Sequence, residues 1–174
     1  MFGGPRKAES ESELYDAALR ALTRRAHSVY EMRKALERRS DDAGSVKNVL
    51  ARLKREKLLD DARYAKQFAR YRIESRRQGR FRIARDLRAR GVPDRHIEKA
   101  LDEAFQGTDE AAAVRKRIER KLKLYGGEID ERRTASIYRS LLRAGFPSEV
   151  IRRELRSMTR EDVAEIAETS TSEE

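Results

Sequence analysis

Apolar residues recur along the chain at intervals of three and four, which is the spacing of one face of an α-helix. The first run carries Leu14, Ala18, Leu19 and Leu22 and ends near Arg24, where a basic residue favours a helix C-terminus. Later runs keep this periodicity, and none alternates with a period of two as a half-buried strand would. The pattern therefore predicts an all-α protein.

Polar residues and glycines divide these runs in the way that helix caps do. Ser28 and Glu31 have the spacing of a capping box, and Asp60 or Asp61 is expected to begin a long helix that ends at Gly79. A capped start followed by a glycine stop predicts separate helices joined by short turns.

Two glycines stand where a left-handed C-terminal cap is expected. Gly91 and Gly145 each follow an apolar run and are each followed two residues later by proline. Glycine is favoured at such caps because it adopts positive φ without steric cost. We therefore predict positive φ at both positions.

The helical pattern repeats three times. Three sets of four apolar residues share spacings of four, ten and four: Met32, Leu36, Val46, Leu50; Ile83, Leu87, Ile97, Leu101; Ile137, Leu141, Ile151, Leu155. A step of four keeps two side chains on one helix face, and a step of ten allows the chain to turn and present the next helix. We predict three tandem three-helix repeats.

Composition favours a thin, elongated arrangement of these repeats, because only 38% of the residues are hydrophobic and 41% are charged. Changes in composition along the chain suggest five segments. These are a disordered lead at 1–10, repeats at 11–57, 58–106 and 107–158, and an acidic tail at 159–174. From residue 161 onward the tail has six acidic residues and no Lys or Arg, so it is expected to compete with polyanions for a basic face.

The chain offers few groups for catalysis. It has no cysteine, its two histidines, His27 and His96, lie far apart, and no glycine-rich phosphate loop is present. Asp60 and Asp61 are a paired carboxylate, which we interpret as helix capping rather than metal binding. We expect no enzyme activity and no cofactor. No apolar run is long enough to span a bilayer and the N-terminus lacks a signal-peptide core, so we expect a cytoplasmic protein without a membrane partner.

The chain has a net charge of +10 and its middle is the most basic part. Between Arg70 and Arg90 nine arginines stand against Glu74 and Asp86. Such density favours a polyanion or an acidic protein surface as partner, whereas a solvated face is the simpler alternative. The candidate partner-binding and DNA-binding residues are Arg63, Lys66, Arg70, Arg72, Arg76, Arg77, Arg80, Phe81, Arg82, Arg85 and Arg88.

Aromatic residues accompany these cations. Tyr64, Phe68 and Tyr71 share one helix face and could stack on unpaired bases, although we favour core packing. Phe81 is expected on the outer face of the next helix among arginines, which suits an interaction surface.

The ordered motifs resemble the RecX family, regulators of the RecA recombinase. The resemblance rests on Leu59-Asp60-Asp61-x-x-Tyr64-Ala65, Arg72, Gly79-x-x-x-Ile83-x-x-x-Leu87-x-x-x-Gly91 and Ile97-x-x-x-Leu101, with Ala18-Leu19-x-x-Leu22-x-x-Arg25-x-x-Ser28 before them and Gly145-Phe146-x-x-x-x-Ile151 after them. It covers about residues 14–157. Gln78 stands where the family usually has Lys, and the acidic tail lies outside the family pattern.

This resemblance implies repeats arranged in an elongated, curved array that binds a RecA filament on single-stranded DNA. It also implies inhibition of filament growth, ATP hydrolysis and strand exchange in recombination, DNA repair and the SOS response. We expect a monomer. The alternative is an autonomous helix-turn-helix-like DNA-binding protein, but the helix expected from Asp94 to Phe105 carries four acidic residues and would face a DNA groove poorly.

Overall fold

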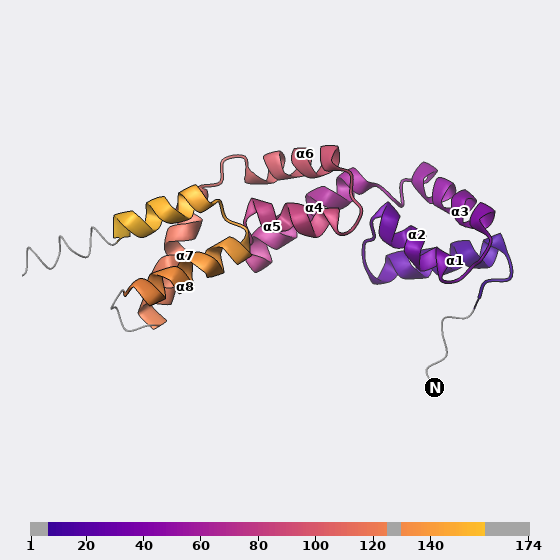
Figure 1. The fold of residues 1–174 in the computed structure, drawn as a ribbon. Coiled ribbons are helices and arrows are strands. Elements are labelled where there is room, and N and C mark those ends of the chain that lie inside the picture. Colours follow the sequence, from indigo (N-terminus) through magenta and orange to yellow (C-terminus); the bar gives the residue numbers. More distant parts are fainter. Residues whose placement is uncertain (1–6, 125–129, 159–174) are drawn as a thin grey trace, which may run out of the picture. The chain divides into compact units, whose positions relative to one another are not determined.

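The computed structural model describes residues 7–124 and 130–158. Every regular element among them is a helix, which confirms the all-α prediction (Figure 1). The helices are α1 (Glu11–Arg24), α2 (Val29–Glu37), α3 (Ala43–Arg55), α4 (Asp61–Arg76), α5 (Arg80–Arg88), α6 (Asp94–Phe105), α7 (Glu110–Leu124) and α8 (Glu131–Ala144), and residues 148–158 are helical as well.

The contacts divide the chain into two units. The first comprises Met1–Arg70 and Ala84–Ala104, and the second comprises Tyr71–Ile83 and Phe105–Glu174. This division by contacts differs from the predicted division into repeats, because α4 and α5 each contribute residues to both units. The boundaries of the three repeats stay a prediction.

In the first unit, α1, α2 and α3 pack around one apolar cluster. Leu14, Met32, Leu36 and Leu53 are at most 1% exposed and come from all three helices. The chain joins this unit before the predicted boundary at residue 11, since the Ala8 N–H donates to the Arg39 carbonyl at 2.8 Å. Part of the predicted lead, residues 1–6, lies outside the described residues.

The second unit has a separate apolar cluster. Val114 and Ile118 of α7 pack with Ile137 and Leu141 of α8 and with Ile151. Each of these side chains is at most 1% exposed. The four-residue spacing found in the sequence therefore places its apolar pairs on the buried side of the helices, as predicted. The predicted acidic tail lies outside the described residues.

The predicted capping box at the start of α2 is confirmed, and its serine also bonds to the backbone that follows α5. The Ser28 hydroxyl accepts from the Glu31 N–H at 3.0 Å and donates to the Arg90 carbonyl at 2.6 Å. Next to Arg90, Gly91 has the predicted positive φ, at 68°. A Cβ added at Gly91 would lie 2.4 Å from the Cβ of Tyr30, so the backbone after α5 lies directly against the side chain of Tyr30 in the first turn of α2.

An equivalent contact forms within the second unit. The Gly79 N–H donates to the Ala144 carbonyl at 2.8 Å, and the Phe81 N–H donates to the Gly145 carbonyl at 3.1 Å. Gly145 has φ 90°, which confirms its predicted left-handed cap. In each unit, therefore, the end of one helix packs by its glycine against the start of an earlier helix. We call the two contacts the α2–α5 joint and the α5–α8 joint.

The structure corrects the predicted role of Gly79. α4 ends at Arg76, and Arg77 takes the left-handed conformation with φ 49°. A Cβ at Gly79 would lie 2.3 Å from the Gly145 carbonyl oxygen. Gly79 is thus required for close backbone approach in the α5–α8 joint, and it does not end the helix.

Glu31 is the polar centre of the first unit. Its carboxylate accepts from Arg25 at 3.1 Å, from the Ser28 N–H at 3.1 Å and from the Tyr64 hydroxyl at 3.2 Å. Burial raises the pKa of Glu31, but these hydrogen bonds outweigh burial and hold the pKa below its usual value. Burial also raises the pKa of Tyr64, to about 12, and the neighbouring Glu31 charge adds to this effect. The ionised form of Glu31 therefore stabilises the fold.

We predict that Gly91→Ala destabilises the protein more than Gly107→Ala. Both glycines have positive φ, at 68° and 72°, so both variants share a cost of about 1–2 kcal/mol for left-handed alanine. No atom lies within 4 Å of the Cβ position at Gly107, whereas Gly91 meets Tyr30, which adds about 1–3 kcal/mol of overpacking. Urea unfolding measures both values, and equal destabilisation would contradict the α2–α5 joint.

We also predict that Glu31→Gln reduces the loss of stability in acid. A carboxyl whose folded pKa lies below its unfolded value contributes stability that is complete above the unfolded pKa, here 4.5, and is lost as pH falls through the folded pKa. Glu31→Gln removes that contribution, and Tyr64→Phe removes one of its donors. Urea unfolding between pH 7 and pH 3 should show the steepest loss in the parent, an intermediate loss in Tyr64→Phe and the smallest in Glu31→Gln. A parent and a Glu31→Gln variant with the same pH dependence would contradict this role.

Candidate interaction surfaces

The exposed cations of α4 belong to the first of two candidate surfaces. Arg63, Lys66 and Arg70 are exposed, as the helical spacing predicts. Two of them also have partners within the unit. Arg63 donates to the Lys57 carbonyl at 2.6 Å, and Lys66 lies 2.8 Å from the Glu103 carboxylate. An external partner must therefore compete with Glu103 for Lys66.

On a helix extending to Gly79, Arg77 would share a face with Arg63, Lys66 and Arg70, but α4 ends at Arg76. Because Arg77 lies beyond the end of α4 in the left-handed conformation, the spacing of 100° per residue no longer applies to it. Its side chain instead lines a cavity of the second unit. Arg76 at the end of α4 is exposed, while Arg72 is half-buried and interacts with neighbouring groups.

The three aromatic residues of α4 have three different environments. Tyr64 is 8% exposed and belongs to the core, as we favoured. Phe68 is half-buried, stacks on Tyr64 with centroids 6.0 Å apart, and is covered by the Arg90 guanidinium at 4.7 Å. Tyr71 is 53% exposed, so core packing was wrong for this residue. A continuous stacking platform is also ruled out, because Arg90 covers the middle ring.

The outer face of α5 matches the prediction. Phe81 is 60% exposed, and Arg85 and Arg88 are exposed, while Ile83 and Leu87 on the opposite face are fully buried. Arg88 lies 2.7 Å from the Asp94 carboxylate, and Arg85 is 3.7 Å from Asp86. Aromatic residues and arginine are enriched at protein interfaces, so this face is a candidate binding surface.

Two other candidate residues of α5 serve the fold. Arg82 is half-buried and donates to the Arg143 carbonyl at 3.1 Å beside the α5–α8 joint. Arg80 is also half-buried and lies near Glu110: burial raises the pKa of the Glu110 carboxyl, and the Arg80 charge opposes that rise. The structure therefore gives these two residues partners within the second unit.

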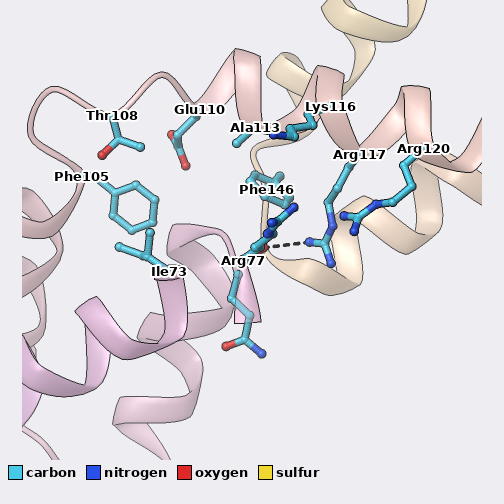
Figure 2. A pocket seen from close by; sticks show the side chains of 11 residues that line it. Ile73, Arg77, Phe105, Thr108, Glu110, Ala113, Lys116, Arg117, Arg120 and Phe146 are labelled. Carbon is cyan, nitrogen blue, oxygen red and sulfur yellow. Dashed lines mark hydrogen bonds between the residues drawn. The ribbon is translucent and has the colours of Figure 1, made fainter. Parts of the chain in front are cut away.

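The second candidate surface is a cavity of about 210 Å³ in the second unit (Figure 2). Its apolar wall includes Ile73, Phe105 and Phe146, and Ile73 and Phe105 point toward one another. The remaining lining residues are Arg77, Gln78, Thr108, Glu110, Ala113, Lys116, Arg117 and Arg120. The sequence analysis missed this cavity.

Positive charge dominates the polar lining of the cavity. Arg117 donates to the Arg77 carbonyl at 2.8 Å, the contact drawn in Figure 2. Burial lowers the pKa of Arg117, and the charges of Arg120 and Arg77 lower it further. Burial has the opposite effect on a carboxyl and raises the pKa of Glu110, which is the one carboxylate that the described residues contribute to the cavity lining. A bound anion would relieve the mutual repulsion of these cations.

Metal and membrane sites are not found in the described ranges. No group of three or more His, Cys, Asp or Glu side chains in residues 7–124 and 130–158 could hold a metal ion. Over the same residues, no helix combines the length and apolar character needed to cross a bilayer. The paired Asp60 and Asp61 act as caps, because they accept from the Arg63 and Val29 N–H groups at 2.9 Å each.

Sequence comparison places this chain in a known family. The first three-helix domain of RecX matches residues 15–53, and the second three-helix domain of RecX matches residues 60–101. A protein of Halorhodospira halophila named Regulatory protein RecX is 41% identical over 140 residues, which are 79% of this chain and 83% of the relative. The chain belongs to the RecX family.

Other similar proteins agree with this family. A Regulatory protein RecX of Trichlorobacter lovleyi is 33% identical over 145 residues, covering 81% of this chain and 92% of the relative. The crystal structure of RecX from Lactobacillus salivarius has a TM-score of 0.75 at 20% identity and covers 86% of this chain and 96% of that one. The structural similarity supports the fold, and the sequence similarity to regulatory proteins supports a regulatory role.

Proposed function

We propose that this RecX-family protein binds RecA recombinase filaments on single-stranded DNA and mainly inhibits their growth, ATP hydrolysis and strand exchange. In this way it would regulate recombination, repair and the SOS response, as a cytoplasmic monomer without catalytic activity of its own. The observation that carries the proposal is the outer face of α5, where Phe81 is 60% exposed beside exposed Arg85 and Arg88.

The chemistry of this face suits a filament of protein and DNA. Guanidinium groups bind carboxylates and phosphates through paired hydrogen bonds and also stack on flat groups. An exposed phenylalanine offers an anchor that can be buried against protein. The α4 cations Arg63, Lys66 and Arg70 would add salt-dependent attraction to the phosphates.

The alternative of a helix-turn-helix-like DNA reader has weaker support. A recognition helix needs uncommitted donors for base edges. The helix considered above as a recognition helix is α6. Its Asp94 pairs with Arg88 at 2.7 Å, and its Glu103 pairs with Lys66 at 2.8 Å. Its carboxylates therefore neutralise nearby cations, which argues against a groove-reading role.

The first test reverses three exposed charges in the middle of the chain. Replacing Arg70, Arg76 and Arg85 together by Glu should leave the fold intact, because exposed substitutions usually change stability by less than about 0.5 kcal/mol each. The variant should need at least tenfold more protein to inhibit ATP hydrolysis by preformed RecA filaments, measured with DNA in excess.

The matched control carries the same change of charge elsewhere. Replacing the exposed Arg20, Arg33 and Lys47 of the first unit by Glu should affect inhibition much less. Equal losses in both variants would mean that only bulk charge matters. Full inhibition by the first variant would mean that its three arginines form a solvated surface.

The second test removes the exposed ring. Phe81→Ala should change the free energy of unfolding by less than about 0.5 kcal/mol, because the ring is 60% exposed. If Phe81 is an anchor, filament binding should weaken by about 2 kcal/mol, which is roughly a 30-fold change in Kd. Leu58→Ala, at a side chain 40% exposed, is the control. Unchanged binding by Phe81→Ala would remove α5 as the contact.

A further inference from the structure

The cavity of the second unit occupies a place that aromatic rings fill in the first unit. Asp60 and Asp109 hold equivalent positions, since each accepts from the N–H three residues further on, at 2.9 and 3.0 Å. Counted from these caps, Ala65 corresponds to Val114 and Ala69 to Ile118, and all four are buried. The two helices α4 and α7 are therefore in register.

In this register Tyr64 corresponds to Ala113 and Phe68 to Arg117. In the first unit the two rings stack at 6.0 Å and Tyr64 is 8% exposed. In the second unit neither position has a ring, and both residues line the cavity. The space exists because α7 lacks the side chains that fill it in α4, so an incoming apolar side chain can take their place.

The polar groups of the cavity define what must accompany that side chain. Among the described residues, four cations, Arg77, Lys116, Arg117 and Arg120, line it against one carboxylate, Glu110. Two buried acceptors, the Oε1 atoms of Gln78 and Glu110, have no hydrogen-bond partner among the described residues. Carboxylates pair with the cations, and the space left by the missing rings takes an apolar side chain. A peptide with acidic and apolar residues supplies both, and its backbone N–H groups are donors of the kind that the two acceptors lack.

The chain itself contains such a peptide. Residues 161–168 read Glu161-Asp162-Val163-Ala164-Glu165-Ile166-Ala167-Glu168, with four carboxylates around two branched apolar side chains and no basic residue. Its charge is opposite to that of the cavity, and Val163 or Ile166 can supply the missing apolar group.

The connecting chain is long enough for this contact. Phe146 lines the cavity, and the helical residues 148–158 that follow rise by about 16 Å at 1.5 Å per residue. The eight residues from 159 to 166 can extend for about 28 Å at most. A tethered segment within reach of its site has an effective concentration of about millimolar.

We infer that the cavity of the second unit is a binding site for an acidic, apolar peptide and that its occupant is residues 161–168 of the same chain. When bound, this segment covers Arg77, Arg117 and Arg120 and withholds them from other anions. The protein thus carries an internal competitor for part of its basic surface, a form of regulation that goes beyond recombinase inhibition itself.

A disulfide cross-link in the full-length chain tests this contact without any recombinase. The chain has no cysteine, so a Lys116→Cys/Ala164→Cys variant contains a single possible internal pair. The control is Glu119→Cys/Ala164→Cys, because Glu119 is exposed on α7 and does not line the cavity. Removing the negative charge of Glu119 can only help an acidic segment to approach, so the lost charge cannot be the cause of a slow cross-link in the control. Under mild oxidation the first pair should form an internal disulfide at least tenfold faster than the control.

Two further measurements show whether charge and the empty space cause the cross-link. Ala113→Tyr, which restores the residue found at the equivalent position of α4, should slow formation of the Lys116→Cys/Ala164→Cys link at least tenfold. Circular dichroism and urea unfolding check that this variant is folded. Raising NaCl from 50 mM to 1 M should also slow the link, because the Debye length falls to about 3 Å at 1 M.

The remaining outcomes overturn the proposal. Equal rates for the two cysteine pairs would mean that the tail does not occupy the cavity. A cross-link that joins two copies, seen as a dimer on a denaturing gel, would assign the site to a second chain. A link insensitive to both salt and Ala113→Tyr would mean that tethering alone brings the cysteines together. Because the readout needs no filament, failure here leaves the proposed inhibition of RecA standing, and full inhibition by the α4 and α5 variants, which would contradict that proposal, leaves this contact standing.

Discussion

Both units depend on the close packing of a helix end, at a glycine, against the start of an earlier helix. At the α2–α5 joint, Gly91 faces Tyr30 and the Ser28 hydroxyl bonds to the Arg90 carbonyl. At the α5–α8 joint, Gly79 and Gly145 lie backbone to backbone. Hydrogen bonds tolerate little change in distance, so these joints fix positions that apolar contacts alone would leave variable.

The joints also explain how a chain with so few hydrophobic residues holds its helices in place. Each apolar cluster is small, and a small core provides limited stabilisation. Much of the remaining precision comes from charged and polar side chains that are used inside the protein. The buried Glu154 accepts from Arg115 at 2.8 Å, and Arg82 donates to the Arg143 carbonyl at 3.1 Å. A high arginine count is therefore not a measure of the surface available to a partner.

Local features were predictable from the sequence, whereas features that depend on distant segments were not. The capping box at Ser28 and the left-handed glycines 91 and 145 were predicted because caps need only neighbouring residues. The role of Gly79 was not, because its reason is Gly145, far along the chain. The exposure of Phe81 was predicted by helical periodicity, while that of Tyr71 was not.

The cavity shows what a fuller comparison of the repeats would have revealed. The matched apolar sets predicted the second and third helices of each proposed repeat, but the helices before them, α4 and α7, were not aligned. Alignment at Asp60 and Asp109 places Tyr64 opposite Ala113, which signals a missing ring. No sequence pattern could have shown that the Oε1 atoms of Gln78 and Glu110 are buried without a hydrogen-bond partner among the described residues, because this depends on packing.

The α2–α5 joint also has a consequence for the order in which the protein is completed during synthesis. The Ser28 hydroxyl and the Arg90 carbonyl that it needs are separated by 62 residues. At roughly 5–20 residues per second, the ribosome makes the acceptor about 3–12 seconds after the donor. During that interval the capping box of Ser28 and Glu31 can already form, but the Ser28 hydroxyl does not yet have the Arg90 carbonyl as its acceptor. Nascent chains of this protein thus pass through a state that is helical but unfinished.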